Sequence, residues 1–291
     1  MPAIIGIIIA VIVGYFAFTG RDLLPFGRGP LATGPGRDTE IQNPQPVETR
    51  GFFGFGQPSP PPAPRPGESP FKDKVRISTV VRSGERPEDE HVIIRFGGFF
   101  SGSSQERPIN VTGWTIGSQR SSAPIPRAFN IPEIDAAEQD ILLPPGGEVI
   151  ILTGTPSYQR NFRENQCVGY FNETHSFTPS LSNSCVDDNP DRSMLLARGF
   201  NGACIDAIRA IPACRIPKGP FQAAVIKPEC IDYMNQNFSY VGCVRNFRDR
   251  RDFLKNTWRV FLGRNQKLFD SRHDRVTLRD RQGLLVDEFE Y

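Results

Sequence analysis

The sequence lacks a strong net charge of either sign. Its 34 lysine and arginine residues are nearly balanced by 32 aspartate and glutamate residues, which leaves a formal net charge of +2. A charge this small gives the whole chain no long-range attraction to nucleic acid or to an anionic membrane surface. Overall charge therefore identifies no partner.

The sequence also lacks the short motifs of common catalytic and cofactor sites, including the serine nucleophile elbow, the phosphate-binding glycine loop and the dinucleotide-binding glycine pattern. His273 and Asp274 are adjacent, but no activated nucleophile accompanies them, so a hairpin position is the better interpretation. The acidic run Asp187–Asp191 lacks the alternating oxygen ligands of a calcium loop and is interpreted as a solvated loop. We expect no enzymatic activity, no metal, no cofactor and no small-molecule substrate.

Charge is absent altogether from Ala3 to Thr19, a segment dominated by isoleucine, valine, phenylalanine and alanine. At a rise of about 1.5 Å per residue, a helix of this length just spans the hydrocarbon core of a bilayer. A buried helix of a globular domain would show a polar face, and this segment shows none. Residues 1–20 are therefore predicted to form a transmembrane anchor. A cleaved signal peptide fits less well, because no basic residue precedes the apolar run.

Two signals disagree about the orientation of this anchor. Arg21, Arg28 and Arg37 follow the segment, and by the positive-inside rule they favour a cytoplasmic position for the rest of the chain. The cysteines described below favour an oxidising compartment outside the cytoplasm. We expect the extracytoplasmic orientation, because three arginines spread over many residues are a diluted signal.

Residues 21–70 lack hydrophobic periodicity and are rich in proline and glycine, with a run of prolines between Pro58 and Pro66. Such a segment cannot bury enough apolar surface to offset the entropy lost on ordering, and the proline run favours an extended polyproline II conformation. The segment is predicted to be a disordered linker that holds a domain away from the membrane. A ligand for a proline-binding module is the alternative.

Folded sequence begins near Phe71, where apolar and polar residues start to alternate. Alternation of this kind, bounded by turn residues, predicts about eight short strands and is typical of an antiparallel β-sandwich over residues 71–291. Trp114 and Trp258 are expected in its core. The predicted strands are Val75–Val81, His91–Phe96, Pro108–Ile116, Ala123–Ile131, Glu148–Thr153, Trp258–Leu262, Lys267–Phe269 and a hairpin within Asp274–Tyr291.

The pattern changes between about residues 155 and 255, which we interpret as an insertion between two strands of the sandwich. Short helices are predicted at Ala203–Ala210 and Glu229–Gln236. No Cys-x-x-Cys pair and no histidine at ligand spacing occurs here, which argues against zinc. An even number of cysteines in a loop-rich segment indicates a disulfide framework. All the cysteines of the chain lie in this segment: Cys167, Cys185, Cys204, Cys214, Cys230 and Cys243.

An internal similarity suggests how the cysteines pair. Cys204 and Cys230 each open a Cys-Ile-Asp segment, and these segments close at Cys214 and Cys243. If the two helical arms pack antiparallel, the start of one meets the end of the other. This predicts the pairs Cys204–Cys243 and Cys214–Cys230, with Cys167–Cys185 left over. Six cysteines allow fifteen pairings, and six reduced buried thiols are a further alternative.

Arginines alternate with aromatic and polar residues shortly after the last cysteine, a pattern found at nucleic-acid contacts. Nearby aspartates offset half of the charge, and Arg248 and Asp252 have the spacing of an ion pair on one helix face. A solvated helix face is therefore the better interpretation. The arginines concerned are Arg245, Arg248, Arg250 and Arg251.

Four segments in order resemble the lamin tail domain, in particular its prokaryotic membrane-tethered versions. They are Val111-Thr-Gly-Trp-Thr-Ile116, an Ile-Pro segment at Ile125, Leu143-Pro-Pro-Gly-Gly-Glu-Val-Ile-Ile-Leu152 and Asp274-Arg-Val-Thr-Leu-Arg-Asp-Arg-Gln-Gly-Leu-Leu-Val-Asp287. The resemblance covers residues 75–155 and 256–291. It implies an immunoglobulin-like β-sandwich that serves as a non-catalytic binding or scaffolding module. The chain has no coiled-coil rod, so filament formation is not implied, and the lamin tail lacks the cysteine-bearing insertion.

We therefore expect a single-pass membrane protein that presents an all-β domain outside the cytoplasm, with a partly helical insertion as its recognition surface. Cell-envelope adhesion or interaction with a protein or surface ligand is the expected role, and the partner cannot be identified from the sequence. One alternative is a nucleic-acid-binding envelope protein that uses the four arginines. The other is a hydrolase with a site inside the insertion.

Overall fold

The computed structural model describes residues 65–97, 106–183, 185–186, 190–219 and 226–291. The predicted anchor Ala3–Thr19, most of the predicted linker and part of the acidic run Asp187–Asp191 lie outside these residues. Within the described part of the chain, no helix is both long enough and apolar enough to cross a membrane.

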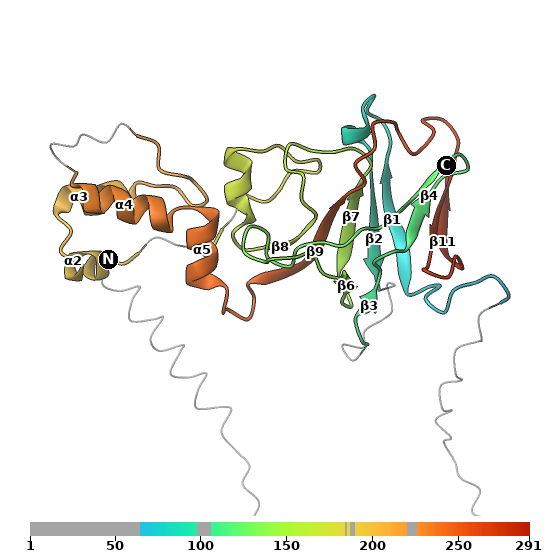
Figure 1. Ribbon diagram of the computed structural model, residues 1–291, viewed down its shortest axis with the longest axis horizontal. Coiled ribbons are helices and arrows are strands. Elements are labelled where there is room, and N and C mark those ends of the chain that lie inside the picture. Colours follow the sequence, from blue (N-terminus) through green and yellow to red (C-terminus); the bar gives the residue numbers. More distant parts are fainter. Residues whose placement is uncertain (1–64, 98–105, 184, 187–189, 220–225) are drawn as a thin grey trace, which may run out of the picture. The chain divides into compact units, whose positions relative to one another are not determined.

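The main sheet has five strands in the order β1-β2-β7-β9-β8 (Figure 1). Neighbouring strands are antiparallel, except that β7 and β9 run parallel. The chain reaches β9 from β8 only after a long excursion, so strands that are distant in sequence become neighbours in space. The strands are β1 (Val75–Val81), β2 (His91–Phe96), β7 (Glu148–Leu152), β8 (Phe162–Asn165) and β9 (Leu254–Phe261).

A second sheet of four strands has the order β11-β10-β4-β5, and a two-stranded ladder joins β3 to β6. The turn between β10 and β11 is fixed by Asp280, whose carboxylate accepts hydrogen bonds from the backbone N–H groups of Gln282 and Leu284. Gly283 supplies the positive φ of +81° that this turn requires. The strands are β3 (Ile109–Asn110), β4 (Thr115–Gly117), β5 (Ser122–Pro124), β6 (Leu142–Leu143), β10 (Arg275–Arg279) and β11 (Leu285–Glu290).

The two larger sheets share one hydrophobic core, which we call the main core. Ile94 and Val260 enter it from the main sheet, and Ile116 and Leu278 enter it from the second sheet. Its tryptophans, Trp114 and Trp258, are 1% and 3% exposed. The edges of the sheets are also joined, because the Asp287 carboxylate of β11 accepts a 2.7 Å hydrogen bond from the Ile77 N–H of β1.

The main sheet is buried on its other face as well. Side chains alternate along β7, so Val149 and Ile151 enter the main core while Ile150 and Leu152 enter a separate cluster. This second core is rich in aromatic residues, most of which come from the segments that follow β7. A strand with no polar face is the expected consequence of burial on both sides.

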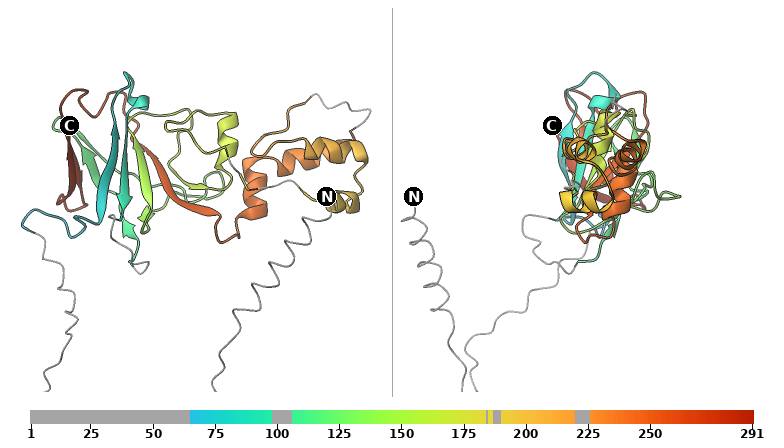
Figure 2. Two further views of the ribbon diagram at one scale, coloured as in Figure 1. Left: turned by 180° about the vertical axis from the view of Figure 1, so that it is seen from behind. Right: turned by 90° about the vertical axis from the view of Figure 1, so that its left-hand side faces the viewer.

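The residues between β8 and β9 form the insertion, which we define as residues 166–253. Its two ends meet, because the Gln166 N–H donates to the Phe253 carbonyl oxygen at 3.0 Å. Its α-helices form a group beside the strands, and its 3₁₀ helix lies nearer to the main sheet, within the second core (Figure 2). They are a 3₁₀ helix η2 (Val168–Glu173) and the α-helices α2 (Arg192–Ala197), α3 (Gly202–Arg209), α4 (Pro228–Asn237) and α5 (Tyr240–Phe247).

The prediction of a β-rich domain with a partly helical segment is confirmed. Four local predictions are wrong. Of the predicted strand Ala123–Ile131, only Ala123 and Pro124 belong to a strand, β5. Phe162–Asn165, placed inside the insertion, is strand β8 and pairs with β9. Pro108–Ile116 is divided into β3 and β4 by a turn. Lys267–Phe269 is not a strand, because the N–H groups of Leu268 and Phe269 bind the buried Glu90 carboxylate instead of a neighbouring strand.

Candidate binding surface on the insertion

Three disulfides lie in the insertion and use all six cysteines of the chain. They are Cys167–Cys243, Cys185–Cys214 and Cys204–Cys230, with sequence separations of 76, 29 and 26 residues. The predicted disulfide framework is therefore confirmed. The three bonds tie the insertion to itself at its base, in its middle loops and between its helices.

The predicted pairings Cys167–Cys185, Cys204–Cys243 and Cys214–Cys230 are wrong. The prediction treated the segment from Cys230 to Cys243 as one helical arm, but the chain turns at Phe238 and Ser239 and starts a new helix, α5. Cys243 on α5 is thereby free to reach the base of the insertion. The remaining helices join through their first turns, because Cys204 and Cys230 each occupy the third position of α3 and α4.

The Cys167–Cys243 disulfide is surrounded by the aromatic second core. The ring centroids of Phe171 and Tyr240 are 4.3 Å apart, and those of Tyr158 and Phe171 are 4.7 Å apart. Burial raises the pKa of Tyr240 above its ordinary value, and its hydroxyl accepts a 2.9 Å hydrogen bond from Asn165 Nδ2. Its hydroxyl therefore stays protonated and serves the packing of the insertion on the sheet.

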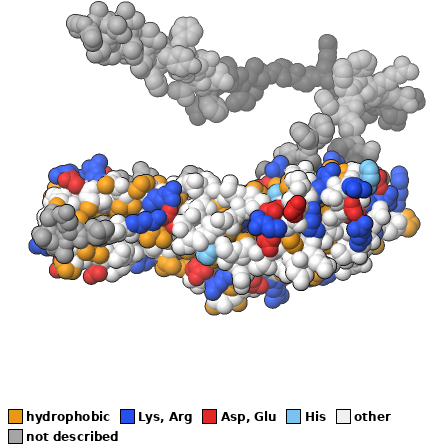
Figure 3. Space-filling view, turned by 90° about the horizontal axis from the view of Figure 1, so that it is seen from above, with side chains coloured by type: hydrophobic (Ala, Val, Ile, Leu, Met, Phe, Trp, Pro, Cys, Tyr) orange, Lys and Arg blue, Asp and Glu red, His pale blue; other side chains and the backbone are white. Residues whose placement is uncertain are grey.

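An open apolar groove of about 490 Å³ lies at the end of α3, and we call it the α3 groove. Ile216 is 37% exposed there, although it is a large apolar side chain. Figure 3 shows hydrophobic and basic side chains close together at the surface of the insertion. The apolar walls of the groove are Ala207, Ala210, Ile211, Pro212, Ile216 and Pro217.

The polar edge of the α3 groove consists of Glu173, Arg215 and Lys218. The Glu173 side chain is only 3% exposed, and it forms ion pairs with Arg215 and with Lys218, the latter at 3.0 Å. Hydrogen bonds from Arg215 and then from Lys218 hold the pKa of Glu173 below its ordinary value. One ionised carboxylate therefore faces two cations, which leaves the edge with an excess positive charge.

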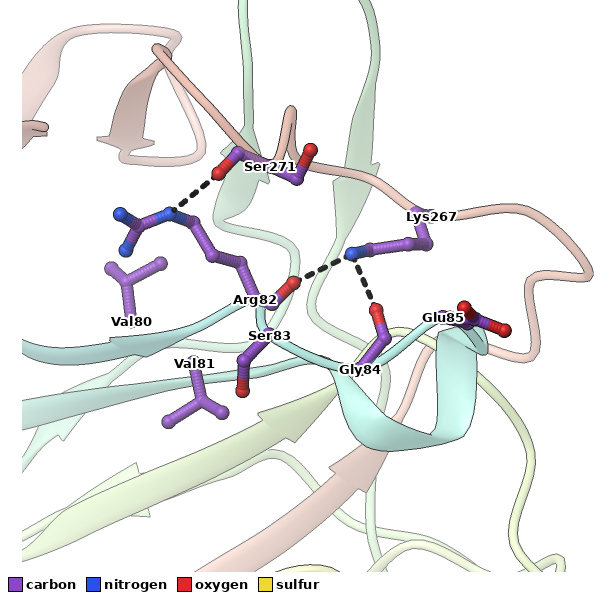
Figure 4. A pocket seen from close by; sticks show the side chains of 8 residues that line it. All are labelled: Val80, Val81, Arg82, Ser83, Gly84, Glu85, Lys267 and Ser271. Atoms are coloured by element: carbon purple, nitrogen blue, oxygen red, sulfur yellow. Dashed lines mark hydrogen bonds between the residues drawn. The ribbon is translucent and has the colours of Figure 1, made fainter.

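A larger hollow of about 730 Å³ lies beside the end of β1, away from the insertion (Figure 4). Lys267 Nζ donates to the carbonyl oxygens of Arg82 and Gly84 at 2.6 and 2.8 Å. Arg82 Nε donates to the Ser271 carbonyl oxygen at 3.3 Å, and its guanidinium lies 3.7 Å from the ring centroid of Tyr291. Both cations hold loops together, so the hollow is better explained as structure than as a site.

The arginines singled out from the sequence are all exposed, but the predicted Arg248–Asp252 pair is wrong. Helix α5 ends at Phe247, so these residues do not share a helix face. Arg250 pairs with Asp252 at 3.1 Å instead, and Arg248 lies 3.8 Å from Asp249. The arginines are Arg245, Arg248, Arg250 and Arg251.

In the part of the chain that the structure describes, no three His, Cys, Asp or Glu side chains are grouped so that they could hold a metal ion. Comparison of the chain with family models, with curated proteins and with solved structures gives no match. The resemblance to the lamin tail domain therefore stays a prediction.

The α3 groove was not predicted from the sequence. Its cation Arg215 and its carboxylate Glu173 are 42 residues apart and belong to no motif. One signal was present. Ala207 on α3 and Ala210 and Ile211 just after its end have helical spacing and are apolar, in addition to the buried stripe of Cys204, Ile205 and Ile208 on α3.

Proposed function

We propose that this protein is a non-enzymatic, membrane-anchored binding or scaffolding protein. Its folded part is an immunoglobulin-like sandwich similar to the lamin tail domain, held outside the cytoplasm, and its role is cell-envelope adhesion or protein interaction. Two sheets that share one core support the sandwich. The uncharged segment Ala3–Thr19 supports the anchor.

The observation that carries the proposal is the disulfide framework. All six cysteines pair, and every pair lies in the insertion. Structural disulfides persist in oxidising compartments and are rare in the cytosol, where thiols are kept reduced. They are also common where a segment is too small or too polar to build a large core of its own. This favours an extracytoplasmic domain whose insertion keeps a fixed shape.

A binding role is better supported than a catalytic one. The lysine and arginine side chains of the two hollows described above contact other groups of the protein, and none of them is hydrogen-bonded to a serine hydroxyl. Binding sites commonly lie on loops that a rigid scaffold positions. The insertion fits that description, because it packs on the main sheet through the second core and its disulfides hold it in one shape.

Thiol labelling tests the compartment. The full-length chain is isolated from its native membrane in the presence of an alkylating agent and its intact mass is measured, with and without prior reduction. We expect no label before reduction and six labels after it. Six labels without reduction would place the domain inside the cell and overturn the proposal. Protease treatment of intact cells, with detection of residues 71–291, gives an independent measure of orientation.

The two alternatives are less well supported. A nucleic-acid-binding role rests on the four exposed arginines, two of which have aspartate partners. The salt dependence of DNA binding tests this role, because the affinity falls steeply with salt when a protein neutralises phosphates. A hydrolase requires a nucleophile and a base that converge on one cleft. Ser83, Ser271 and Glu85 line the larger hollow, but no hydrogen bond joins either serine hydroxyl to Glu85 or to Lys267, which donates to backbone carbonyls instead.

A further inference from the structure

The α3 groove combines an apolar interior with a positively charged edge, and this combination indicates the chemistry of its ligand. A ligand for this groove presupposes the proposed binding function, to which it adds the class of partner. The volume of about 490 Å³ lies in the range of small-ligand sites, which spans about 300–1,000 Å³. The groove is open to the surface, so its occupant can be part of a larger molecule.

The interior of the groove favours an apolar side chain. Ala207 and Ala210 form one wall and are too small to fill the space, and Ile211 and Ile216 offer branched surfaces to a ligand. Pro212 and Pro217 have no backbone N–H, so these positions of the lining add no backbone donor that a polar ligand could bind. Removal of this apolar surface from water is the expected main source of binding energy.

The edge of the groove favours a negatively charged ligand. Arg215 and Lys218 are 52% and 77% exposed, whereas the carboxylate that they share is buried. Arg215 donates one N–H to Glu173, and its other guanidinium N–H groups have no hydrogen-bond partner among the described residues. Because Glu173 is already ionised and engaged, the edge attracts an anion and repels a cation.

The groove is also held in shape before any ligand arrives. Cys214, in the loop that forms one wall, is bonded to Cys185, and this disulfide packs against Gly169 in η2. Helix α3, which forms the other wall, is bonded to α4 through Cys204–Cys230. Two covalent attachments limit the ordering entropy that binding would otherwise cost.

We propose that the α3 groove binds an acidic segment of a partner protein, which inserts an apolar side chain between α3 and the Pro212–Lys218 loop. The carboxylates of that segment lie against Arg215 and Lys218. Charge complementarity selects an acidic segment over a basic one, and the apolar interior selects a segment that carries a large hydrophobic residue.

The proposal is tested by fluorescence anisotropy with labelled peptides. The protein is the full chain in detergent, with its disulfides oxidised. The probe is an acidic peptide with two central apolar residues, EEDLFEDD. One comparison peptide reverses the charge, KKRLFKRR, and another removes the apolar pair, EEDSSEDD. We expect saturable binding of the first peptide only. Decanoate, an apolar anion of lipid type, is added as a competitor.

Two pairs of variants separate the groove from general surface effects. Lys218→Glu reverses one edge charge and is matched by Lys74→Glu, an exposed lysine on the β-rich part. Ile216→Ser removes the apolar contact and is matched by Leu142→Ser, which is 52% exposed elsewhere. Each groove variant is expected to weaken the binding of EEDLFEDD by about tenfold, or about 1.4 kcal/mol, because Ile216→Ser loses an apolar contact and Lys218→Glu repels the acidic peptide that Lys218 attracts. The matched variants are expected to leave it unchanged.

The outcomes are distinct. Equal binding of the acidic and basic peptides, unchanged binding in both groove variants, or absence of binding would overturn the proposal. Displacement of the peptide by decanoate at lower concentration than by unlabelled EEDLFEDD would assign the groove to a lipid-type ligand and also overturn it. None of these results tests in which compartment the domain lies, because thiol labelling tests that separately.

Discussion

Arg259 donates through Nε to the Glu164 carboxylate at 2.6 Å, and the two side chains are 3% and 9% exposed. They lie on the neighbouring strands β9 and β8. Arg259 also donates to the carbonyl oxygens of Pro179 and Ser180, the latter at 3.2 Å. One buried guanidinium therefore joins the main sheet to a loop of the insertion.

Replacement of this guanidinium should be strongly destabilising. Arg259→Met leaves the buried Glu164 with only Lys255 nearby, at 3.9 Å, and leaves two loop carbonyls without a donor. Loss of one partner of a buried ion pair typically costs about 3–5 kcal/mol. The free energy of unfolding, measured by urea titration, checks this. Arg95→Met breaks the exposed Arg95–Glu148 pair and should cost less than about 1 kcal/mol; a similar loss in both variants would contradict the prediction.

Removal of the disulfide between α3 and α4 should have a local effect. Cys204–Cys230 lies in a small cluster with Leu195, Ile208 and Met234, which shares no residue with the second core. A variant with both cysteines replaced by alanine should show faster amide hydrogen exchange in α3 and α4 and unchanged exchange in β9. The same change at Cys167–Cys243 should speed exchange in β8 and β9 as well, because that bond lies in the second core. Uniform exchange changes in the first variant would be inconsistent with separate clusters.

A single methyl group at Gly169 should disturb the Cys185–Cys214 bond. A Cβ at this position would lie 2.3 Å from Cys214 Sγ and 3.1 Å from Cys185 Sγ, so the disulfide or η2 would have to shift. Gly169→Ala is expected to cost about 1–3 kcal/mol, as overpacking of a core does. Gly202→Ala is the control, since nothing lies within 4 Å of its Cβ position. Urea titration and disulfide mapping by peptide mass are the measurements, and equal stability of the two variants would refute the prediction.

Acidification should destabilise the domain through His91. This side chain is 7% exposed, and burial, followed by the positive charge of Arg259, lowers its pKa below the ordinary value. The unfolded chain therefore binds a proton at His91 more readily than the folded chain does. The contribution of neutral His91 to the free energy of unfolding is present above the unfolded pKa of about 6.5 and is lost as the pH falls below it. The loss is at most about 1.4 kcal/mol per pH unit. His91→Phe should flatten this part of the curve of unfolding free energy against pH. The exposed His273→Asn should not, and an unchanged slope in His91→Phe would exclude His91 as the cause.

Local sequence patterns predicted much of the β-rich part. The alternation in Val75–Val81 corresponds to β1, and the apolar and polar residues around Asp280 and Gly283 correspond to the β10–β11 hairpin. Both elements depend on residues that are close in the sequence, and alternation of apolar and polar residues indicates such strands directly. The uninterrupted apolar run from Val149 to Leu152 indicates more than the presence of a strand. A strand without a polar face indicates a covering layer on each side.

The insertion was less predictable, because its contacts join residues that are far apart in the sequence. The disulfide pairing depended on one turn at Phe238 and Ser239, where no glycine and no proline marks the boundary between α4 and α5. Ser239 provides a cap, since its hydroxyl accepts a hydrogen bond from the Gly242 N–H at 3.1 Å, and that residue type was the only local sign. The α3 groove had no local sign for its charged edge, which tertiary packing alone assembles from Glu173 and Arg215.

The apolar outer side of β7 has a consequence for attempts to shorten the chain. The ends of the insertion meet at Gln166 and Phe253, so a tight turn could replace everything between them without straining the backbone. Such a deletion would expose Ile150, Leu152 and Phe261, which form a continuous apolar surface. The minimal domain would then self-associate or precipitate. A shortened chain therefore needs a replacement segment that covers the same side chains.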